Sequence, residues 1–317
     1  MPAMVVTRAP TRIDLGGGWT DVPPYCDREG GFVCNIAINR FATVTINGDA
    51  APADIPSDPL VRAVLRRSGL EGASASLAND FPVGAGLGGS SAAGAALIVA
   101  ADEWRGRSWN RRDVAEEGRR IEVEDMGIAG GRQDHYAAVF GGALALTFGP
   151  RAVVEVRRIT MDSQRAAAFA ARCVLVYTGQ SRVSGETITA VLGAYESGDR
   201  PVVTALARMR DIARQMAAAL ERGDFDSVGG LLAEHWRFQR GLHRSIPTPL
   251  IDEIIAKAAG AGAIGAKAMG ASGGGCVLVL APESGADRVR SALAPLGSIV
   301  DFGLDMDGVT VVQRRAE

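Results

Sequence analysis

The sequence predicts an α+β protein built from two domains. Its 317 residues are too many for one small hydrophobic core and suit two domains of ordinary size. Segments rich in β-branched and apolar residues, typical of strands, occur in both halves, while a long stretch in the middle is helical. Hydrophobic residues make up 47% of the chain and charged residues 22%, the composition of a soluble globular protein. We place the domain boundary near residue 160, which gives domains at residues 1–160 and 161–317.

The first domain is expected to contain both strands and helices. Strand-type segments lie at residues 5–15, 31–38, 41–46, 73–77, 143–148 and 153–159, and the second and third of these are expected to pair. Helical patterns lie at residues 58–68, 91–104 and 110–125, and a further helix is expected to start at residue 133. We expect Gly69 to end the first helix and Asn110 to cap the third. The second helix is nearly all apolar and small, which predicts burial on most sides.

The second domain is expected to be mostly helical. A helical stretch runs from residue 184 to about residue 244, with breaks at residues 199–201 and 223–224. Further helices are expected at residues 249–261 and 284–293. Strands are expected at residues 173–177 and 276–280 and near Ile299 and Val309.

Composition excludes several classes of protein. Lys and Arg number 34 against 36 acidic residues, so a nucleic-acid binder, which would show a basic excess, is not expected. The N-terminus lacks the apolar stretch of a signal peptide, and no segment is long and apolar enough to span a membrane. The four cysteines show no CxxC spacing, so neither a zinc site nor a disulfide framework is expected. These features predict a cytoplasmic protein with reduced cysteines.

Residues 82–93 place four glycines and two serines directly ahead of the apolar helix. Glycine lets the backbone approach an anion closely and adopt positive φ. The start of a helix then points unpaired N–H groups and the positive end of its dipole at that anion. A serine hydroxyl in the first turn can cap the helix or bind the Mg²⁺ that accompanies ATP. The segment therefore predicts an ATP-binding loop made of Gly84, Gly86, Leu87, Gly88, Gly89, Ser90 and Ser91.

Two other interpretations of this loop are open from its residues alone. Gly84, Gly86 and Gly89 satisfy the GxGxxG pattern of dinucleotide-binding folds. Pro82 interrupts the strand that should lead into that pattern, however, and Asp102 lies inside the following helix rather than at the end of a strand. A flexible loop with a serine N-cap is the simpler alternative. The common nucleotide loop GxxxxGK[ST] is absent, so the predicted kinase loop is of a different kind.

Two further segments accompany the glycine-rich loop, one at residues 8–23 and one at residues 267–276. In order and spacing, the three segments resemble the three motifs of the GHMP kinases, the superfamily of galactokinase, homoserine kinase and mevalonate kinase. The resemblance covers almost the whole chain. It implies a two-domain fold, with an N-terminal mixed α/β domain containing a left-handed βαβ unit and a C-terminal ferredoxin-like α+β domain. It also implies phosphoryl transfer from ATP with Mg²⁺.

Details of the motifs narrow the implied acceptor to a sugar. The Gly-Gly-Trp-Thr-Asp run at residues 17–21 is similar to that of L-fucokinases and of D-glycero-D-manno-heptose 7-phosphate kinases. Residues 131–142 and 177–182 look particularly like the heptose kinases. Two departures leave the sugar open: Ser272 stands where a glycine is usual, and Trp19 is closer to the fucokinases.

The resemblance assigns the chemistry to particular residues. Asp134 is implied to be the catalytic base, and Arg12 is implied to pair with it and to stabilise charge on the transferred group. Ser91 and Glu122 are implied to bind Mg²⁺, which prefers oxygen ligands, although Glu124 lies close and helix register decides between the two acids. Simpler interpretations are an N-cap for Asp134, a surface ion pair for Arg12 and an exposed helix acid for Glu122.

The acceptor is implied to bind between the first and third motifs. Thr20 and Asp21 are the candidate sugar ligands, because a carboxylate can accept two hydroxyl hydrogen bonds, although a simple turn would also explain them. Gly273 and Gly274 are expected to close over the acceptor, and a tight turn before the next strand would need the same glycines. Three basic residues are candidate contacts for a phosphate group on the acceptor: Arg182, Lys267 and Arg244.

The leading functional prediction is therefore an ATP-dependent kinase for the anomeric (C-1) hydroxyl of a sugar or sugar phosphate. D-glycero-D-manno-heptose 7-phosphate is favoured over L-fucose. A kinase for another small-molecule alcohol, such as a polyol or an isoprenoid precursor, is an alternative. A non-catalytic sensor of sugar and ATP is disfavoured by the presence of Asp134, Arg12 and Ser91. An NAD-dependent oxidoreductase would require the dinucleotide interpretation of the loop.

Overall fold

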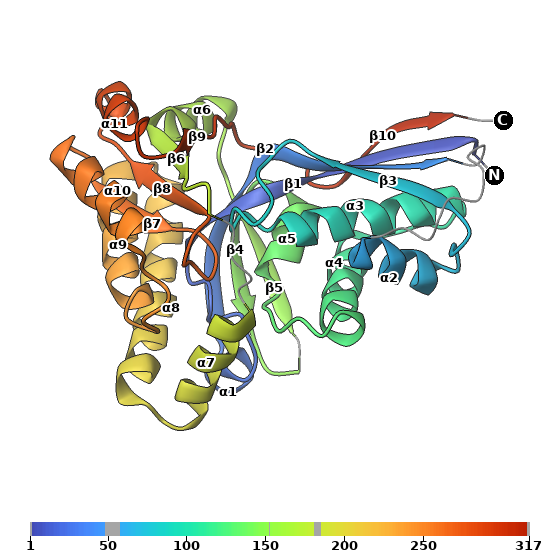
Figure 1. Ribbon diagram of the computed structural model, residues 1–317, viewed down its shortest axis with the longest axis horizontal. Coiled ribbons are helices and arrows are strands. Elements are labelled where there is room, and N and C mark those ends of the chain that lie inside the picture. The colour runs from blue at the N-terminus through green and yellow to red at the C-terminus, as the bar shows by residue number, and fades with distance from the viewer. Residues whose placement is uncertain (1, 48–57, 152, 181–184, 316–317) are drawn as a thin grey trace.

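The structure, a computed structural model, describes residues 2–47, 58–151, 153–180 and 185–315. Its strands form two separate sheets (Figure 1). The first sheet has the order β10-β1-β2-β4-β5, with β3 also paired to β2, and these pairs are antiparallel. Its strands are β1 (Met4–Gly16), β2 (Gly31–Asn47), β3 (Ser74–Asn79), β4 (Ala143–Phe148), β5 (Val154–Ile159) and β10 (Thr310–Arg315).

The strand β2 corrects one prediction. Residues 31–38 and 41–46 were expected to form two paired strands, but they belong to one continuous strand. Pro10 of β1 pairs with Phe41, whereas the next residue of β1 pairs with Ile38, so two residues of β2 bulge out of the ladder. A proline lacks the N–H group that a regular ladder needs, which suits it to such an irregularity. The chain therefore bends there instead of turning back.

The strands β3 and β4 are joined by a long helical crossover. Both pair with the edge of β2 that faces away from β1, so they run parallel to each other. The crossover consists of α3 (Gly89–Trp104), α4 (Arg111–Arg120), the π-helix η1 (Ile121–Asp125) and α5 (Gln133–Phe140). This connection is a βαβ unit, and the left hand that the family resemblance implies for it stays a prediction.

The predicted helix at residues 110–125 begins as expected and then changes type. Asn110 accepts a hydrogen bond from the backbone N–H of Asp113, which confirms the cap. Regular α-helix ends at Arg120, and the chain continues as a π-helix in which the N–H of Met126 reaches the carbonyl of Ile121. The wider turn rotates the acidic side chains that follow, and such π-helical turns are frequent at functional sites.

The second sheet confirms the predicted ferredoxin-like half. Its strands are β6 (Cys173–Tyr177), β7 (Gly265–Ala268), β8 (Cys276–Leu280) and β9 (Ser298–Ile299), in the spatial order β7-β8-β6-β9. Every described pair is antiparallel, and the chain order of strand, helices, two strands, helix and strand gives the βαββαβ pattern. The helices outside the crossover are, in chain order, α1 (Tyr25–Glu29), α2 (Pro59–Ser68), α6 (Ser163–Arg172), α7 (Gly185–Glu196), α8 (Arg200–Arg222), α9 (Phe225–Gln239), α10 (Pro249–Gly260) and α11 (Ala286–Leu293).

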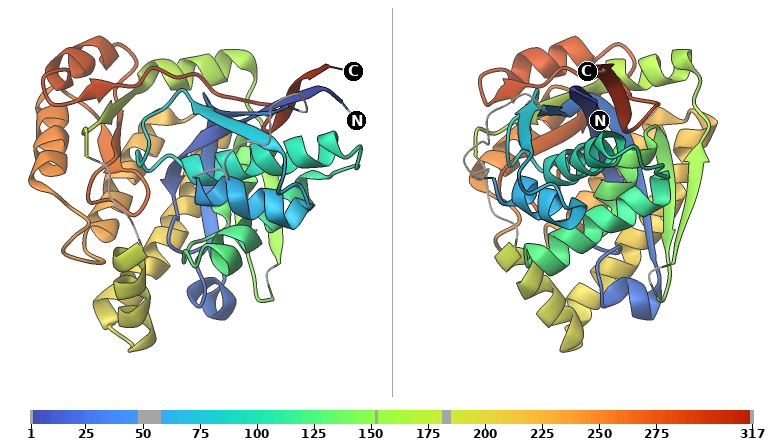
Figure 2. Two further views of the ribbon diagram at one scale, coloured as in Figure 1. Left: turned by 45° about the vertical axis from the view of Figure 1, so that its right-hand side comes forward. Right: turned by 90° about the vertical axis from the view of Figure 1, so that its right-hand side faces the viewer.

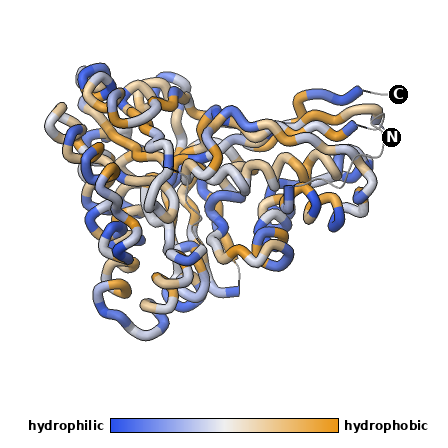
Figure 3. Tube along the Cα trace, viewed as in Figure 1, coloured by the Kyte–Doolittle hydropathy of each residue, from blue (hydrophilic) through white to orange (hydrophobic). Residues whose placement is uncertain are grey.

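Helices from both halves of the chain cover the first sheet (Figure 2). Successive strand residues point to opposite faces, so Val33 joins the core under α3, whereas Cys34 and Ile36 join the core under α8. The helix α3 is buried along most of its length, as its apolar sequence predicts. Apolar stretches follow the strands through the interior, and strongly hydrophilic stretches lie on outer helix turns and loops (Figure 3). The two halves therefore share a hydrophobic core.

The end of the chain returns to the first sheet. The strand β10 pairs with β1, so both termini lie at the same end of the molecule (Figure 1). A single boundary near residue 160 falls between β5 and α6 but does not separate the two sheets, because residues 310–315 belong with the first. None of the described helices has the length and apolar character needed to cross a membrane.

Candidate active site

The predicted phosphate-binding loop leads directly into α3. Gly84, Gly86 and Gly88 have φ of 74°, 74° and 72°, a left-handed conformation that glycine adopts without strain. Ser91 lies buried in the first turn of α3. The strand β3 ends at Asn79, so no strand runs into the first glycine as a dinucleotide-binding turn requires. Unpaired N–H groups and the helix dipole favour an anion at this end of α3.

All three predicted motifs meet at this loop. The N–H of Arg12 donates to the carbonyl of Leu87 at 2.9 Å, and the N–H of Cys276 donates to the carbonyl of Ala85 at 2.8 Å. A Cβ on Gly86 would lie 2.9 Å from the carbonyl oxygen of Met269, closer than real side chains approach. The glycine-rich loop is therefore held between β1 and the loop that precedes β8, at the junction of the two halves.

Arg12 and Asp134 form a two-bonded ion pair beside the loop. Nε and Nη2 of Arg12 donate to the two carboxylate oxygens of Asp134, each at 2.7 Å, and Nη1 donates to the carbonyl of Gly86 at 2.6 Å. The Arg12 side chain is 5% exposed and that of Asp134 is 28% exposed. The ion pair of Arg12 is therefore not on the surface. The Asp134 side chain binds Arg12 and does not cap α5. Paired, charge-assisted bonds of this geometry are among the strongest in proteins.

The structure shows which of the two candidate acids, Glu122 or Glu124, faces the predicted metal site. Glu124 pairs with Arg67 on the surface. Glu122 instead turns inward, where its carboxylate lies 2.9 Å from Nε2 of His135, and Ser91 Oγ lies 3.5 Å from the same nitrogen. Burial alone would raise the pKa of Glu122, but His135 and neighbouring donors hold it below its usual value, so the carboxylate is ionised. Glu122 and Ser91 therefore meet at the same nitrogen of His135, a residue not among the predicted ones.

Asp21 lies at the start of the helix that carries Asp134. Its carboxylate accepts the backbone N–H of Gln133 at 3.0 Å, and a Cβ on Gly131 would lie 1.8 Å from it. Thr20 is fully buried; its hydroxyl donates to the carbonyl of Gly17 and accepts the N–H of Phe32. Thr20 thus makes the contacts of a turn that presents Asp21. Burial is the main cause that raises the pKa of Asp21 to about 6; the Gln133 N–H opposes the rise, and Asp134 adds to it.

Asp21→Asn is expected to stabilise the protein at neutral pH. The folded state holds the Asp21 proton more tightly than the unfolded state, so its contribution to stability falls as pH rises from about 4 to about 6 and stays low above that range. Asparagine can still accept the Gln133 N–H without carrying the charge. We expect a gain on the order of 2 kcal/mol near pH 7.5 that shrinks towards pH 4. Thermal unfolding at both pH values, with the exposed Asp27→Asn as control, measures it; a gain that does not depend on pH would contradict the expectation.

The loop of the third motif packs between neighbouring loops. Gly273 donates its N–H to the carbonyl of Ile246, and a Cβ on Gly274 would lie 2.7 Å from the carbonyl of Gln180. Ser272, which replaces the usual glycine, has φ of 64° and accepts a hydrogen bond from Gln239 at 3.0 Å. The turn that the glycines were alternatively expected to form is present, and closure over an acceptor stays a prediction. Arg182 lies outside the described residues.

A buried ion pair that the sequence did not predict links the two halves. Nζ of Lys267 donates to the carboxylate and to the backbone carbonyl of Asp14, both at 2.7 Å. Lys267 is fully buried, so it is not available to a substrate phosphate, which corrects that prediction. His235 Nε2 accepts the N–H of Gly17 nearby, and burial lowers the pKa of His235 to about 3, so its ring is neutral. The available signal at Asp14 was an acid between two apolar residues, Ile13 and Leu15.

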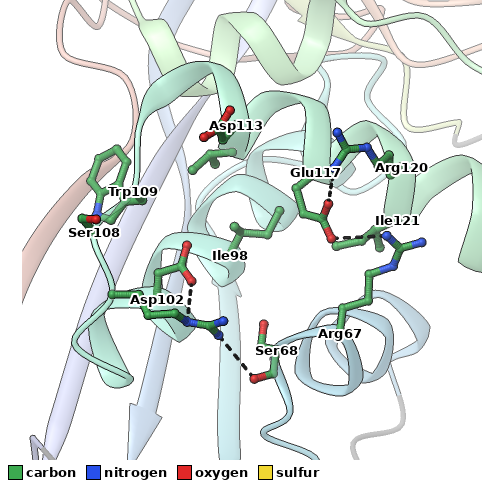
Figure 4. Close-up of a pocket in the computed structure, with 12 residues that line it drawn as sticks. Arg67, Ser68, Ile98, Asp102, Ser108, Trp109, Asp113, Glu117, Arg120 and Ile121 are labelled. Carbon is green, nitrogen blue, oxygen red and sulfur yellow. Dashed lines mark hydrogen bonds and ion pairs between the residues drawn. The ribbon is translucent and has the colours of Figure 1, made fainter.

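A cavity of about 310 Å³ lies away from this site, between α2, α3 and α4 (Figure 4). Its charged side chains largely pair with one another. Arg67 and Arg120 both contact Glu117, and Arg107 contacts Asp102. The cavity contains none of the predicted site residues. The candidate active site is the cluster around Arg12 and Asp134 instead.

Comparison with known proteins agrees with the order of the motifs. Residues 59–142 match the family model "GHMP kinases N terminal domain", and residues 216–297 match "GHMP kinases C terminal". A D-glycero-alpha-D-manno-heptose 7-phosphate kinase of Campylobacter jejuni is 28% identical, over 96% of this chain and 97% of that protein. A bifunctional fucokinase/GDP-fucose pyrophosphorylase of Arabidopsis thaliana is 24% identical, over 89% of this chain but 30% of that protein.

Solved structures show the same architecture. A D-glycero-D-manno-heptose 1-phosphate kinase from Bacteroides thetaiotaomicron superposes with a TM-score of 0.76 at 25% identity, covering 98% of this chain and 99% of that one. This likeness extends over both sheets. Gly86 lies in the range that matches the N-terminal model and Met269 in the range that matches the C-terminal model, so the two matched ranges meet at the glycine-rich loop.

Proposed function

The chain belongs to the GHMP kinases, phosphotransferases that act on an alcohol group, and from this premise we propose that it phosphorylates the anomeric hydroxyl of a sugar with ATP. The favoured acceptor is D-glycero-D-manno-heptose 7-phosphate. The observation that carries the proposal is the Arg12–Asp134 pair directly beside the glycine-rich loop, where a Cβ on Gly88 would lie 3.3 Å from the Asp134 carboxyl carbon. The heptose kinases named above support the choice of acceptor.

Asp134 is proposed to accept the proton of the sugar hydroxyl. Each carboxylate oxygen has two lone-pair sites, so a carboxylate that binds Arg12 through both oxygens still has room for the acceptor hydroxyl. Arg12 fixes the carboxylate in one orientation and places positive charge next to the loop that would hold the transferred phosphoryl group. Positioning and charge stabilisation are the main requirements of phosphoryl transfer.

The nucleotide is proposed to lie along the glycine-rich loop, with its phosphates at the start of α3. The loop residues in this role are Gly84, Gly86, Leu87, Gly88, Gly89, Ser90 and Ser91. Ser91 and Glu122 fit Mg²⁺, because both offer oxygen atoms that lie within 3.5 Å of the same His135 nitrogen. When bound, Mg²⁺ would neutralise charge on the phosphates.

The sugar is proposed to bind above the turn that carries Asp21. The proposed contacts are Asp21 itself and the backbone of Gly273 and Gly274, with Arg182 from the second half. Thr20, which is fully buried, holds the turn that presents Asp21 and does not touch the sugar. Asp21 accepts the N–H of Gln133, the residue before Asp134 in α5, and the two acids lie within electrostatic range of one another. A hydroxyl-rich ligand could therefore contact both. We also propose that the protein works in a reducing compartment such as the cytoplasm, because its four cysteines are free and buried.

Two other functions are kept as alternatives. An L-fucokinase activity is favoured by the fucokinase relative and by Trp19, which has φ of 80° and lies buried beside the acceptor turn. A kinase for another small alcohol would use the same Arg12–Asp134 pair. A non-catalytic sensor would not need Asp134 to be held by both oxygens, which argues against that class.

A panel of acceptors tests the proposal. ADP release is measured with D-glycero-D-manno-heptose 7-phosphate, the unphosphorylated heptose, L-fucose, mevalonate and a polyol, and phosphorus NMR locates the new phosphate. We expect the heptose phosphate to give the highest kcat/KM and the new phosphate to be on C-1. If no sugar raises ADP release above the background ATPase rate, the sugar-kinase proposal is wrong.

A further inference from the structure

Arg119 is a half-buried cation that makes no direct ion pair with any described residue, and acids act on it only from a distance. It lies near the end of α4, one turn before Glu122. Its Nε is buried and has no hydrogen-bond partner, and no described residue forms an ion pair with its guanidinium. An arginine carries five N–H donors and remains charged in proteins. Burying such a group without acceptors is costly, so its side chain is set up for a ligand anion.

A second arginine lies within electrostatic range of Arg119. Arg132 precedes α5, and its side chain is 13% exposed. It contacts Glu116 at 3.5 Å through Nε, while the other oxygen of Glu116 accepts the hydroxyl of Tyr136 at 2.7 Å. Burial, and next the charge of Arg132, lower the pKa of Arg119. Two like charges held close together favour a bound anion between them.

The two arginines lie beside the proposed sugar site. Gly131, next to Arg132 in the chain, packs directly against the Asp21 carboxylate. The acids that act on Arg119 are, from strongest to weakest, Glu122, Asp21 and Glu116. Each has another partner: Glu122 contacts His135, Asp21 accepts the Gln133 N–H and Glu116 is shared by Arg132 and Tyr136. The donors of Arg119 and the terminal N–H groups of Arg132 are therefore left for a molecule bound at Asp21, while Nε of Arg132 keeps its contact with Glu116.

We infer that Arg119 and Arg132 bind a phosphate group carried by the acceptor, so that the acceptor is a sugar phosphate and not a neutral sugar. This inference rests on the proposed kinase function. The acceptor would lie over Asp21, with its reacting hydroxyl at Asp134 and its phosphate at the two guanidinium groups. The same chemistry would suit a phosphate of ATP, but the glycine-rich loop, Arg12 and the start of α3 already provide donors for the nucleotide.

The wild-type enzyme gives the first test. We compare kcat/KM for D-glycero-D-manno-heptose 7-phosphate with that for the same heptose without its phosphate. Charge-assisted hydrogen bonds to two arginines predict a preference of about a hundredfold or more for the phosphorylated sugar. Equal kcat/KM for the two sugars would overturn the inference and leave the kinase proposal intact. Absence of ADP release with either sugar, or with any other in the panel, would count against the kinase proposal instead.

The variant Arg119→Gln gives the second test, with Arg120→Gln as matched control, since Arg120 is the next residue and pairs with Glu117 on the surface. We expect KM for the sugar phosphate to rise about ten- to hundredfold in Arg119→Gln, with KM for ATP unchanged. Calorimetric binding of the sugar phosphate without ATP should weaken by the same factor. A rise in KM for ATP alone would place the arginine at the nucleotide and overturn the inference. If Arg119→Gln does not fold, two other variants replace it: Arg119→Lys, which keeps the charge but loses the planar set of donors, and Arg132→Gln. An unchanged KM for the sugar phosphate in both of these variants would also overturn the inference.

Discussion

Asp134→Asn is expected to reduce kcat by about 10²- to 10⁴-fold, the range that a general base contributes. The asparagine amide cannot accept the proton of the sugar hydroxyl. It would also turn an NH₂ group towards Arg12, which at present donates to both oxygens of the carboxylate. The variant therefore loses the proposed base and leaves the 5%-exposed Arg12 side chain with a poorer partner. The chemical step should be slowed far more than substrate binding.

The measurement is kcat and KM for both substrates, together with ATP affinity by equilibrium binding and thermal unfolding. ATP affinity should stay near that of the wild type, because the glycine-rich loop is held by backbone contacts from Arg12 and Cys276 rather than by Asp134. Asp252→Asn is the control: Asp252 also lies in the first turn of a helix and pairs with an arginine, Arg240, but on the surface. Turnover in Asp134→Asn close to that of Asp252→Asn would show that the base lies elsewhere.

Much of this site could be predicted because its parts are local in sequence. The glycine-rich loop, with its serines and apolar helix, is contiguous, and its positive φ values follow from glycine positions that the sequence displays. Arg12 and Asp134 were predicted only through the resemblance to a family. Nothing in the spacing of 122 residues between them indicates that their side chains meet.

Helix register could not be predicted near Glu122. A regular α-helix through residue 125 leaves Glu122 and Glu124 as competing candidates, because one residue of offset turns a side chain by about 100°. The π-helix changes that offset, and no local signal predicts it; α4 packs against α3 and α5, and η1 packs against α2. The tertiary structure, not helix propensity, therefore points Glu122 at His135.

The strand arrangement shows a similar limit. Two strands of the second sheet, β6 and β8, were predicted because each is an apolar segment with clear ends, and both have the predicted bounds. The four-residue strand β7 and the helix α6 were not predicted, since β7 contains small residues with little strand preference. The return of β10 to the first sheet depends on a pairing between the two ends of the chain, which no local pattern encodes.

Lys267→Met is expected to lower the free energy of unfolding by about 3–5 kcal/mol, the cost of breaking a buried ion pair from one side. Lys267 is 0% exposed and Asp14 is 3% exposed, and Lys267 provides the contacts of the Asp14 carboxylate that the structure records. Methionine fits a similar volume but leaves the carboxylate unpaired. The exposed Lys257→Met is the matched control and should leave stability unchanged.

Removing the other charge as well tests the cause. In Asp14→Leu/Lys267→Met no charge is left buried, so the double variant should be more stable than Lys267→Met, whereas additive losses would mean that packing and not charge explains the effect. Both variants change the surroundings of position 14, which lies in the strand that leads into Gly16–Gly18. Gly18 packs directly against the Asp14 carboxylate, since a Cβ on Gly18 would lie 2.4 Å from it. We therefore expect a higher KM for the sugar in both.

The pH dependence separates the ion pair from a general packing defect. Burial by itself would raise the pKa of Asp14, but Lys267 next to it holds that pKa below its ordinary value, so the carboxylate stabilises the wild type above the unfolded pKa. Without Lys267 burial dominates, and the pKa of Asp14 rises above the unfolded value. The stability of Lys267→Met should then fall more steeply than that of the wild type as pH rises from about 4 to about 7, because Asp21 contributes the same fall to both proteins and Asp14 adds to it only in the variant. Denaturant unfolding at both ends of this range decides the matter: a stability difference that stays constant with pH would mean that Asp14 remains charged and accommodated without its partner.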